Sequence, residues 1–226
     1  MGTLTPKLDT LPSRQRLLWR ELGPTPRHFV LYGGTALALR LAHRESVDFD
    51  FFSNRPFQPF ELLRSIPYLA KQRATQQAEN TLTCSVETAE GEVTISFFGG
   101  LPLRQIAAPD LAESNGVSIA SLLDLFGTKC VTIAQRSERK DYLDIHALLT
   151  RTSLTLPEGI AAAREIYGRQ YDPLMTLQAL SYFADLTEPL EELTKKDLLA
   201  AVGELSLQNL PTITASSEIG APSPGS

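Results

Sequence analysis

The first half of the chain alternates apolar and polar positions in short runs that predict strands, with helical stretches between them. The segment 28–32 is short and apolar, 36–42 contains strong helix formers, and 47–51 alternates apolar with acidic residues. Residues 82–86 alternate in the same way, and an Ala-Glu-Gly turn leads into a further alternating run over 92–98, which predicts a hairpin. Mixed strands with helices beside them predict an α/β (α+β) sheet domain.

The second half of the chain has helical spacing instead. Ser118 is a good N-cap, and the apolar residues after it recur every three or four positions, which predicts a helix with one buried stripe. A second helix is expected from about Glu138 to Leu149. Three more are expected over 158–167, 173–186 and 189–202, with proline at or near each start.

These patterns predict three parts in the chain. We expect a sheet domain over 1–115 and a helical region packed on it as a C-terminal cap over 116–208. The segment 209–226 is rich in Pro, Ser and Gly and is expected to be disordered.

Composition is compatible with a globular protein and sets limits on its partners. The 226 residues are 42% hydrophobic, enough for a sizeable core, and the net charge of -5 argues against nonspecific coating of nucleic acid. A local basic patch at Arg136, Arg139 and Lys140 could still contact an acceptor, although a solvated helix junction is the alternative. Cys84 and Cys130 lie in apolar patterns and are expected to be reduced core residues. The N-terminus lacks a signal pattern and no apolar run reaches membrane-spanning length, so we expect a cytoplasmic protein without a membrane segment.

The alternating run 47–51 carries the first candidate chemistry. Val47, Phe49 and Phe51 are expected to point into a core, which leaves Asp48 and Asp50 on the opposite strand face. Carboxylates roughly 7 Å apart repel by about 2.5 kcal/mol at a dielectric constant of about 20, and a bound divalent cation would reverse that sign. The alternative is a solvated strand face without function.

A glycine turn precedes the acids and strengthens this hypothesis. Gly33 and Gly34 end the strand 28–32, and a backbone without a Cβ can approach a ligand closely. Thr35 is expected to open the helix, whose first amides suit phosphate oxygens. A plain turn is the alternative, but the combination of turn, helix and acidic strand favours a site for Mg²⁺ and a triphosphate.

Three segments resemble the nucleotidyltransferase superfamily and, within it, the AbiEii/AbiGii toxin family. They are GGTALAL (33–39), HRESVDFDFFS (43–53) and KCVTIAQRSERKDYLDIHALL (129–149), and the resemblance covers about half of the chain. It implies a nucleotidyltransferase-like mixed sheet with flanking helices and transfer of a nucleoside monophosphate from an NTP, with Mg²⁺, to an acceptor. In characterised toxins of this kind the acceptor can be the 3′ end of tRNA; a protein acceptor stays open. The resemblance also implies a cognate antitoxin as a partner.

The third segment contains the second group of candidate residues. Lys129 falls on the apolar stripe of its helix, where a lysine must either reach the surface or meet an anion such as a nucleotide phosphate. A solvated ammonium at the helix edge is the alternative. Asp141 and Asp144 lie on or beside the core face of the next helix, and one of them is expected to point toward Lys129, the metal site or an acceptor hydroxyl. The alternative for Asp141 is a first-turn residue stabilised by the helix dipole. By resemblance, Lys followed by Asp-x-x-Asp matches the family's second functional region.

One position departs from the superfamily pattern. Ser96 stands on the strand 92–98 where many members carry a third carboxylate. A serine cannot act as a general base at neutral pH, so Asp141 or Asp144 substitutes for the acid, or catalysis relies on metal and positioning, or activity has been lost. Glu92 shares the strand face but lies too far along it.

The primary hypothesis is therefore a Mg²⁺-dependent nucleotidyltransferase toxin. Its expected site consists of metal ligands Asp48 and Asp50, phosphate contacts Gly33, Gly34, Thr35, Arg44 and Ser46, the charge-neutralising Lys129, and Asp141 or Asp144 at the acceptor hydroxyl. A noncatalytic nucleotide-binding module that regulates a partner is the main alternative, motivated by Ser96. A structural protein with surface acids is the third.

Overall fold

The structure is a computed structural model that describes residues 2–221. Its described residues form two compact units. Unit 1 contains residues 2–103, 108–121 and 217–221, whereas unit 2 contains 104–107 and 122–216.

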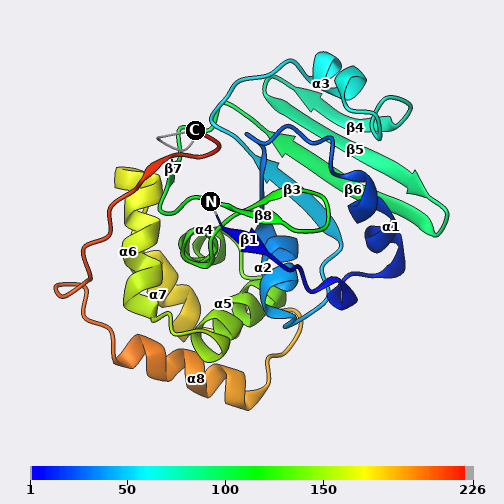
Figure 1. Cartoon of the computed structure of the whole chain (residues 1–226). Coiled ribbons are helices and arrows are strands. Elements are labelled where there is room, and N and C mark those ends of the chain that lie inside the picture. Colours follow the sequence, from blue (N-terminus) through cyan, green and yellow to red (C-terminus); the bar gives the residue numbers. More distant parts are fainter. Residues whose placement is uncertain (1, 222–226) are drawn as a thin grey trace. The chain divides into compact units, whose positions relative to one another are not determined.

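Unit 1 is built on a mixed sheet, as the sequence predicted. In the described residues its strands follow the order β1-β8-β9-β2-β3-β6-β5-β4, and β3 pairs antiparallel with β2 and parallel with β6 (Figure 1). The strands are β1 (Thr3–Leu4), β2 (Val30–Tyr32), β3 (Asp48–Phe52), β4 (Arg73–Ala78), β5 (Thr81–Thr88), β6 (Gly91–Phe98), β8 (Asp110–Ala112) and β9 (Ser118–Ile119). The helices of this unit are α1 (Ser13–Glu21), α2 (Gly33–Leu41) and α3 (Pro59–Ser65), with a short 3-10 turn over Leu8–Thr10.

One face of this sheet forms an aromatic core with α1. Phe49 and Phe51 are fully buried, as expected from their alternation with the acids. Phe49 stacks on Trp19 of α1 with ring centroids 6.2 Å apart, and Phe51 stacks on Phe97 of β6 at 5.2 Å. The expectation for Val47 is wrong: it precedes β3 and is 42% exposed, because the alternation begins only where strand pairing begins.

The hairpin predicted from residues 82–98 is present, but the strand β4 that pairs with it was not predicted. Strands β5 and β6 pair antiparallel along their full length. Strand β4, at one end of the strand order, has the sequence RATQQA and is mostly exposed. A polar edge strand has no apolar alternation, so its pairing with β5 could not be recognised from local sequence.

Unit 2 is mainly helical, which confirms the prediction made from the helical spacing of apolar residues in the second half of the chain. Its first helix begins at Leu122 rather than after Ser118, because Ser118 and Ile119 form β9 and pair with β2 in unit 1. Across the described residues, no helix combines the length and apolar character needed to cross a membrane. The elements are α4 (Leu122–Gln135), α5 (Arg139–Arg151), α6 (Leu156–Tyr167), α7 (Pro173–Ser181), α8 (Glu192–Gly203), the 3-10 turn Gly168–Gln170 and the short strand β7 (Arg104–Gln105).

The segment 209–226, expected to be disordered, lies partly outside the described residues, since 222–226 are not among them. In the described part, β10 covers Ser217–Glu218 and the side chain of Ile219 is fully buried. The Ile219 amide donates to the Leu103 carbonyl at 3.2 Å, and the Ile219 carbonyl accepts from the Asn54 amide at 2.9 Å. These backbone hydrogen bonds hold the end of the described chain to unit 1, which composition alone does not reveal.

Candidate functional site

The glycine bend is part of a helix start. Helix α2 begins at Gly33 directly after β2, two residues earlier than the expected start at Thr35. Gly33 has φ +72°, a left-handed conformation that glycine adopts without steric cost. This residue lets the chain pass from strand to helix without a loop. The amides of Gly33, Gly34 and Thr35 therefore lie in the first helical turn, where backbone donors have no intrahelical acceptor.

The structure brings this bend and the acidic strand together. Tyr32 at the end of β2 pairs with Asp50 of β3. A Cβ added to Gly33 would lie 3.0 Å from Oδ2 of Asp50, so the carboxylate packs directly against the glycine backbone. The bend and the second acid thus form one local site in unit 1.

The side chains of Arg44 and Ser46 lie against the first turn of α2 at Gly34. A Cβ on Gly34 would lie 2.5 Å from Nη2 of Arg44 and 3.0 Å from Oγ of Ser46. The buried Thr35 hydroxyl hydrogen-bonds with Ser46 Oγ at 2.9 Å and with the backbone oxygen of Asp48. The Thr35 side chain therefore connects the helix start to the acidic strand. Because its hydroxyl is used in these hydrogen bonds, the group of Thr35 that suits a phosphate is its backbone amide.

The two acids share one face of β3 and differ in exposure. Asp48 is exposed and Asp50 half-buried, and both lie opposite the fully buried Phe49. In residues 2–221 no group of three or more His, Cys, Asp or Glu side chains is placed to hold a metal ion. Mg²⁺ commonly takes one or two carboxylates and completes its shell with phosphate oxygens and water. The residues present fit Mg²⁺ in this mode and do not form an all-protein cage.

Ser96 occupies the position beside the acids that the sequence indicated. In the parallel ladder between β3 and β6, Asp50 pairs with Ser96 and Asp48 pairs with Thr94. Ser96 is 7% exposed, and its Oγ accepts a hydrogen bond from the Thr83 hydroxyl of β5 at 3.2 Å. Sequence reasoning did not identify Thr83. Ser85 and Thr83 alternate with buried residues in β5, and that alternation was the only available signal.

Glu92 cannot take the place of the third acid. It lies near the start of β6, is exposed, and accepts a hydrogen bond from the Ser85 hydroxyl at 2.6 Å. The Asp50–Ser96 pair is four residues further along the same strand.

The second group of predicted residues forms a buried ion cluster in unit 2. Nζ of Lys129 lies 2.8 Å from Oδ1 of Asp141 and 2.6 Å from Oδ2 of Asp144, and both carboxylates are fully buried. Nε of Arg136 lies 3.0 Å from the other oxygen of Asp141. Both aspartates therefore point toward Lys129, where one was expected to do so. The alternative of a solvated ammonium is wrong, whereas Asp141 does lie in the first turn of α5, as its helix-dipole alternative requires.

The neighbouring basic residues also have partners within unit 2. Lys140 pairs with Glu138 at 2.8 Å, and its hydrogen bond lowers the pKa of the Glu138 carboxyl. Arg139 donates from Nε to the Pro189 carbonyl at 3.0 Å. The basic residues expected to form a local patch are thus paired within unit 2, with Arg136 and Lys140 sharing Glu138, and this observation favours the helix-junction interpretation.

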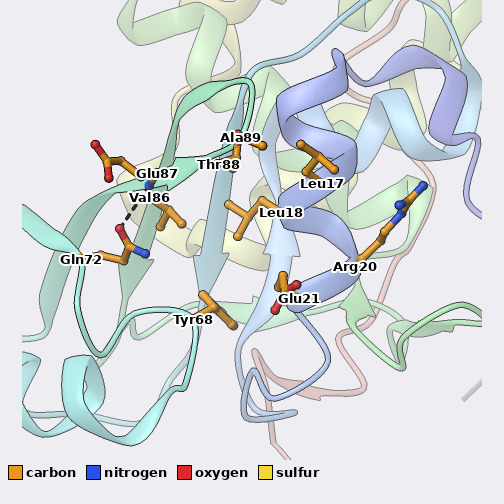
Figure 2. A pocket seen from close by; sticks show the side chains of 10 residues that line it. All are labelled: Leu17, Leu18, Arg20, Glu21, Tyr68, Gln72, Val86, Glu87, Thr88 and Ala89. Carbon is orange, nitrogen blue, oxygen red and sulfur yellow. Dashed lines mark hydrogen bonds between the residues drawn. The ribbon is translucent and has the colours of Figure 1, made fainter.

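A cavity of about 380 Å³ lies in unit 1 on the other side of the sheet (Figure 2). Leu17 and Leu18 of α1 line it together with Tyr68 and Val86. Val86 and Ser85 are consecutive in β5 and so point to opposite faces, and Ser85 faces the same way as Thr94 and the acids. The cavity is therefore separate from the carboxylates.

The predicted residues thus fall into two groups, each assembled within its own unit. Unit 1 holds Gly33, Gly34, Thr35, Arg44, Ser46, Asp48 and Asp50, and unit 2 holds Lys129, Asp141 and Asp144.

Comparison with known proteins gives consistent results. The family described as "Nucleotidyl transferase AbiEii toxin, Type IV TA system" matches residues 16–211. An uncharacterized protein of Aquifex aeolicus (strain VF5) is 34% identical over 167 residues, which cover 73% of this chain and 78% of that protein.

Two solved structures share the fold. One is MenT4, a nucleotidyltransferase toxin from Mycobacterium tuberculosis H37Rv, with a TM-score of 0.55 and 17% identity, covering 86% of this chain and 83% of MenT4. The other is an antigenic nucleotidyltransferase-like protein from Paracoccidioides brasiliensis, with a TM-score of 0.51 and 15% identity over 94% of this chain and 97% of that one. The glycine bend, the acidic strand and the family match lead to one conclusion: the chain belongs to the AbiEii nucleotidyl transferase toxin family of type IV toxin–antitoxin systems.

Proposed function

We propose that this protein transfers a nucleoside monophosphate from an NTP, with Mg²⁺, to a hydroxyl group of an RNA such as tRNA or of a protein. The observation that carries the proposal is the packing of the Asp50 carboxylate against Gly33, with Arg44 and Ser46 against Gly34. A carboxylate suited to a metal ion, and cationic and neutral groups suited to phosphate, thus lie around one helix start, and this supports the proposal. Membership of a nucleotidyltransferase toxin family supports the reaction class.

In this mechanism the residues of unit 1 bind and orient the triphosphate. Asp48 and Asp50 would hold Mg²⁺, which when bound supplies positive charge to the phosphate oxygens. The amides in the first turn of α2 would donate to those oxygens, and Arg44 would neutralise the leaving pyrophosphate. Phosphoryl transfer needs in-line positioning and charge stabilisation more than covalent help from the protein, and these groups supply both.

The unit 2 cluster would supply the remaining roles. Lys129 is proposed to neutralise phosphate charge, and Asp141 or Asp144 to orient or deprotonate the acceptor hydroxyl. Asp141 has one oxygen bonded to Lys129 and the other to Arg136. Asp144 also pairs with Lys129 and both carboxylates are fully buried, so these contacts favour neither aspartate over the other for this role.

A labelling assay tests the reaction. The full chain is incubated with each labelled NTP, Mg²⁺, and total RNA or total protein. Asp48→Asn and Asp50→Asn should abolish transfer, and so should chelation of Mg²⁺. Glu92→Gln is the matched control, since it removes an exposed carboxylate from the same sheet face and should leave transfer unchanged. Equal labelling by the wild type and both aspartate variants would show that the site assignment is wrong.

A noncatalytic nucleotide-binding module is the second candidate, because Ser96 and not an acid pairs with Asp50. It predicts NTP binding in calorimetry without turnover, and steady pyrophosphate release would exclude it. Under either proposal a cognate antitoxin is the expected partner, and the cytoplasm, where NTPs are found, is the expected place of action.

A further inference from the structure

A buried threonine hydroxyl lies where the first turn of α2 meets the start of the acidic strand. Thr35 is 1% exposed, and its Oγ1 is within hydrogen-bonding distance of two oxygens, the backbone oxygen of Asp48 and, at 2.9 Å, Oγ of Ser46. A threonine hydroxyl has one hydrogen and two lone pairs. It can therefore donate to one of these oxygens, and the hydrogen bond with the other must run in the opposite direction.

The direction of both hydrogen bonds follows from which atoms carry a hydrogen. The Asp48 carbonyl oxygen has none and can only accept, so the Thr35 hydroxyl donates to it. Ser46 is then the donor in the second hydrogen bond, and Thr35 Oγ1 is the acceptor. Because its one hydrogen is used at Thr35, the Ser46 hydroxyl offers only lone pairs to any further group.

These lone pairs suit a cation and not a phosphate. Ser46 Oγ and Arg44 Nη2 lie at the same place on the helix start, since a Cβ added to Gly34 would be 3.0 Å from the first atom and 2.5 Å from the second. Nη1 of Arg44 donates to the Glu45 carbonyl at 2.8 Å, which orients the guanidinium from its other side. An oxygen that cannot donate repels a phosphate oxygen, but it accepts readily from a guanidinium N–H.

Resting on the proposed function, we propose that Ser46 and Thr35 are positioning residues of the triphosphate site. Ser46 accepts from Arg44 and so orients the guanidinium toward the phosphates. Thr35 fixes both Ser46 and the first residue of β3 against α2. The groups that touch the phosphates are then Arg44 and the backbone amides of the first turn of α2. In this proposal Ser46 contributes to phosphate binding through Arg44 and not by donating its own hydrogen.

Binding of a nonhydrolysable NTP analogue with Mg²⁺, measured by calorimetry on the full chain, tests Thr35 without the transfer reaction. Thr35→Val keeps the shape of the side chain but removes the hydroxyl. It should weaken binding about twofold to tenfold, the usual effect of one hydrogen bond. Thr35→Ser keeps the hydroxyl and should therefore bind the analogue within about twofold of the wild type.

Thr176 of unit 2 provides a matched control. Its Oγ1 also donates to a backbone oxygen, that of Cys130 at 2.7 Å, and also lies beside a second hydroxyl, that of Tyr171 at 2.8 Å. Thr176 is fully buried, so Thr176→Val removes a comparable hydroxyl from the interior. Both valine variants should have a lower melting temperature than the wild type, but only Thr35→Val should weaken binding of the analogue.

A double-mutant cycle separates a role through Arg44 from direct contact with phosphate. Ser46→Ala should weaken binding of the analogue in the wild-type background and have no further effect in the Arg44→Gln background. If the Ser46 hydroxyl donated to phosphate itself, Ser46→Ala would weaken binding by the same factor in both backgrounds. That result would overturn the proposed role of Ser46.

The outcomes separate this inference from the proposed function. Unchanged binding by Thr35→Val, or equal weakening by Thr35→Val and Thr176→Val, would overturn the positioning role and leave the proposed transfer standing. Binding of the analogue that depends on the Thr35 hydroxyl, without any transfer of label from NTPs, would refute the proposed transfer and leave the positioning role standing. Failure of the wild type to bind the analogue would refute both.

Discussion

Replacing Lys129 with methionine should destabilise the protein strongly, because Lys129 is the shared cation of two buried acids. Its ammonium lies 2.8 Å from Asp141 and 2.6 Å from Asp144. Methionine keeps most of the length and apolar contact of lysine but supplies no charge. Both carboxylates would then lose this ion pair while they stay buried, which is the most costly way to break a buried salt bridge.

The size of the expected loss in the free energy of unfolding depends on the contacts that Asp141 and Asp144 keep without Lys129. Removing one partner of a buried ion pair costs about 3–5 kcal/mol. Arg136 remains 3.0 Å from Asp141 and offsets part of the loss on that acid, although its side chain is 47% exposed. We therefore expect a loss near the lower end, about 3 kcal/mol in the free energy of unfolding. For a folding unit of roughly 100 residues, this corresponds to a fall in Tm of about 12–24 °C.

Urea and thermal unfolding, followed by circular dichroism, measure this loss against a matched control. Lys195→Met removes a lysine from α8 that pairs with Glu192 at 2.7 Å on the surface. That pair is an exposed i,i+3 contact, so its loss should cost less than about 1 kcal/mol. In the Lys129→Met background, Asp144→Asn removes one buried charge that has lost its ammonium partner and should recover part of the lost stability.

Two results would refute this reasoning. The first is an equal cost for Lys129→Met and Lys195→Met, which would mean that the ion cluster in unit 2 contributes no more than a surface pair. The second is a further loss of stability when Asp144→Asn is added to Lys129→Met. The measurement also bears on function, since lost transfer in a Lys129 variant indicates a catalytic role only if the variant is folded at the assay temperature.

Glycine and cysteine positions give two further predictions. Gly127→Ala should lower the free energy of unfolding by about 1–3 kcal/mol, because a Cβ at Gly127 would lie 3.0 Å from the backbone of Ala162 in α6. The control, Gly203→Ala, has no neighbour among the described residues within 4 Å and should raise the free energy of unfolding by up to about 1 kcal/mol through helix propensity. Equal effects of the two substitutions in chemical denaturation would contradict the close α4–α6 packing. Burial raises the pKa of the Cys84 thiol from 9.0 to about 11 and also raises the pKa of Cys130, so the native protein should resist thiol labelling at pH 8. Because the thiols of the unfolded chain ionise first, the free energy of unfolding should fall as pH rises from about 9 to about 11. Cys84→Ala should reduce that fall.

Several features of this protein were determined by local sequence. The alternation of Asp48 and Asp50 with Phe49 and Phe51 predicted one acidic and one buried face, because side chains in any strand alternate regardless of its neighbours. The helical spacing after Leu122 predicted the helical second half for a similar reason. The glycine pair and the acids also carried the family resemblance, which the family match confirms. The chemical roles of these residues stay predictions.

Tertiary structure decided which residues meet. Strand β4 and the end of the described chain around Ile219 are held by backbone hydrogen bonds, and such bonds do not depend on side-chain pattern. Ser118 has the local signal of an N-cap, yet pairing with β2 placed it in a strand. For Ser118 and for the segment around Ile219, a partner distant in the chain outweighed local preference.

The same distinction applies to the candidate site. Sequence spacing placed Lys129 and the two following aspartates on core-facing helix surfaces, but only the packing of α4 against α5 showed that both carboxylates bind the same ammonium. Likewise, the pairing of Asp50 with Ser96 depends on strand register between segments far apart in the chain, and that of Ser96 with Thr83 on register within the β5–β6 hairpin. Register is set by the whole sheet, and a shift of one residue would turn each of these side chains to the other face.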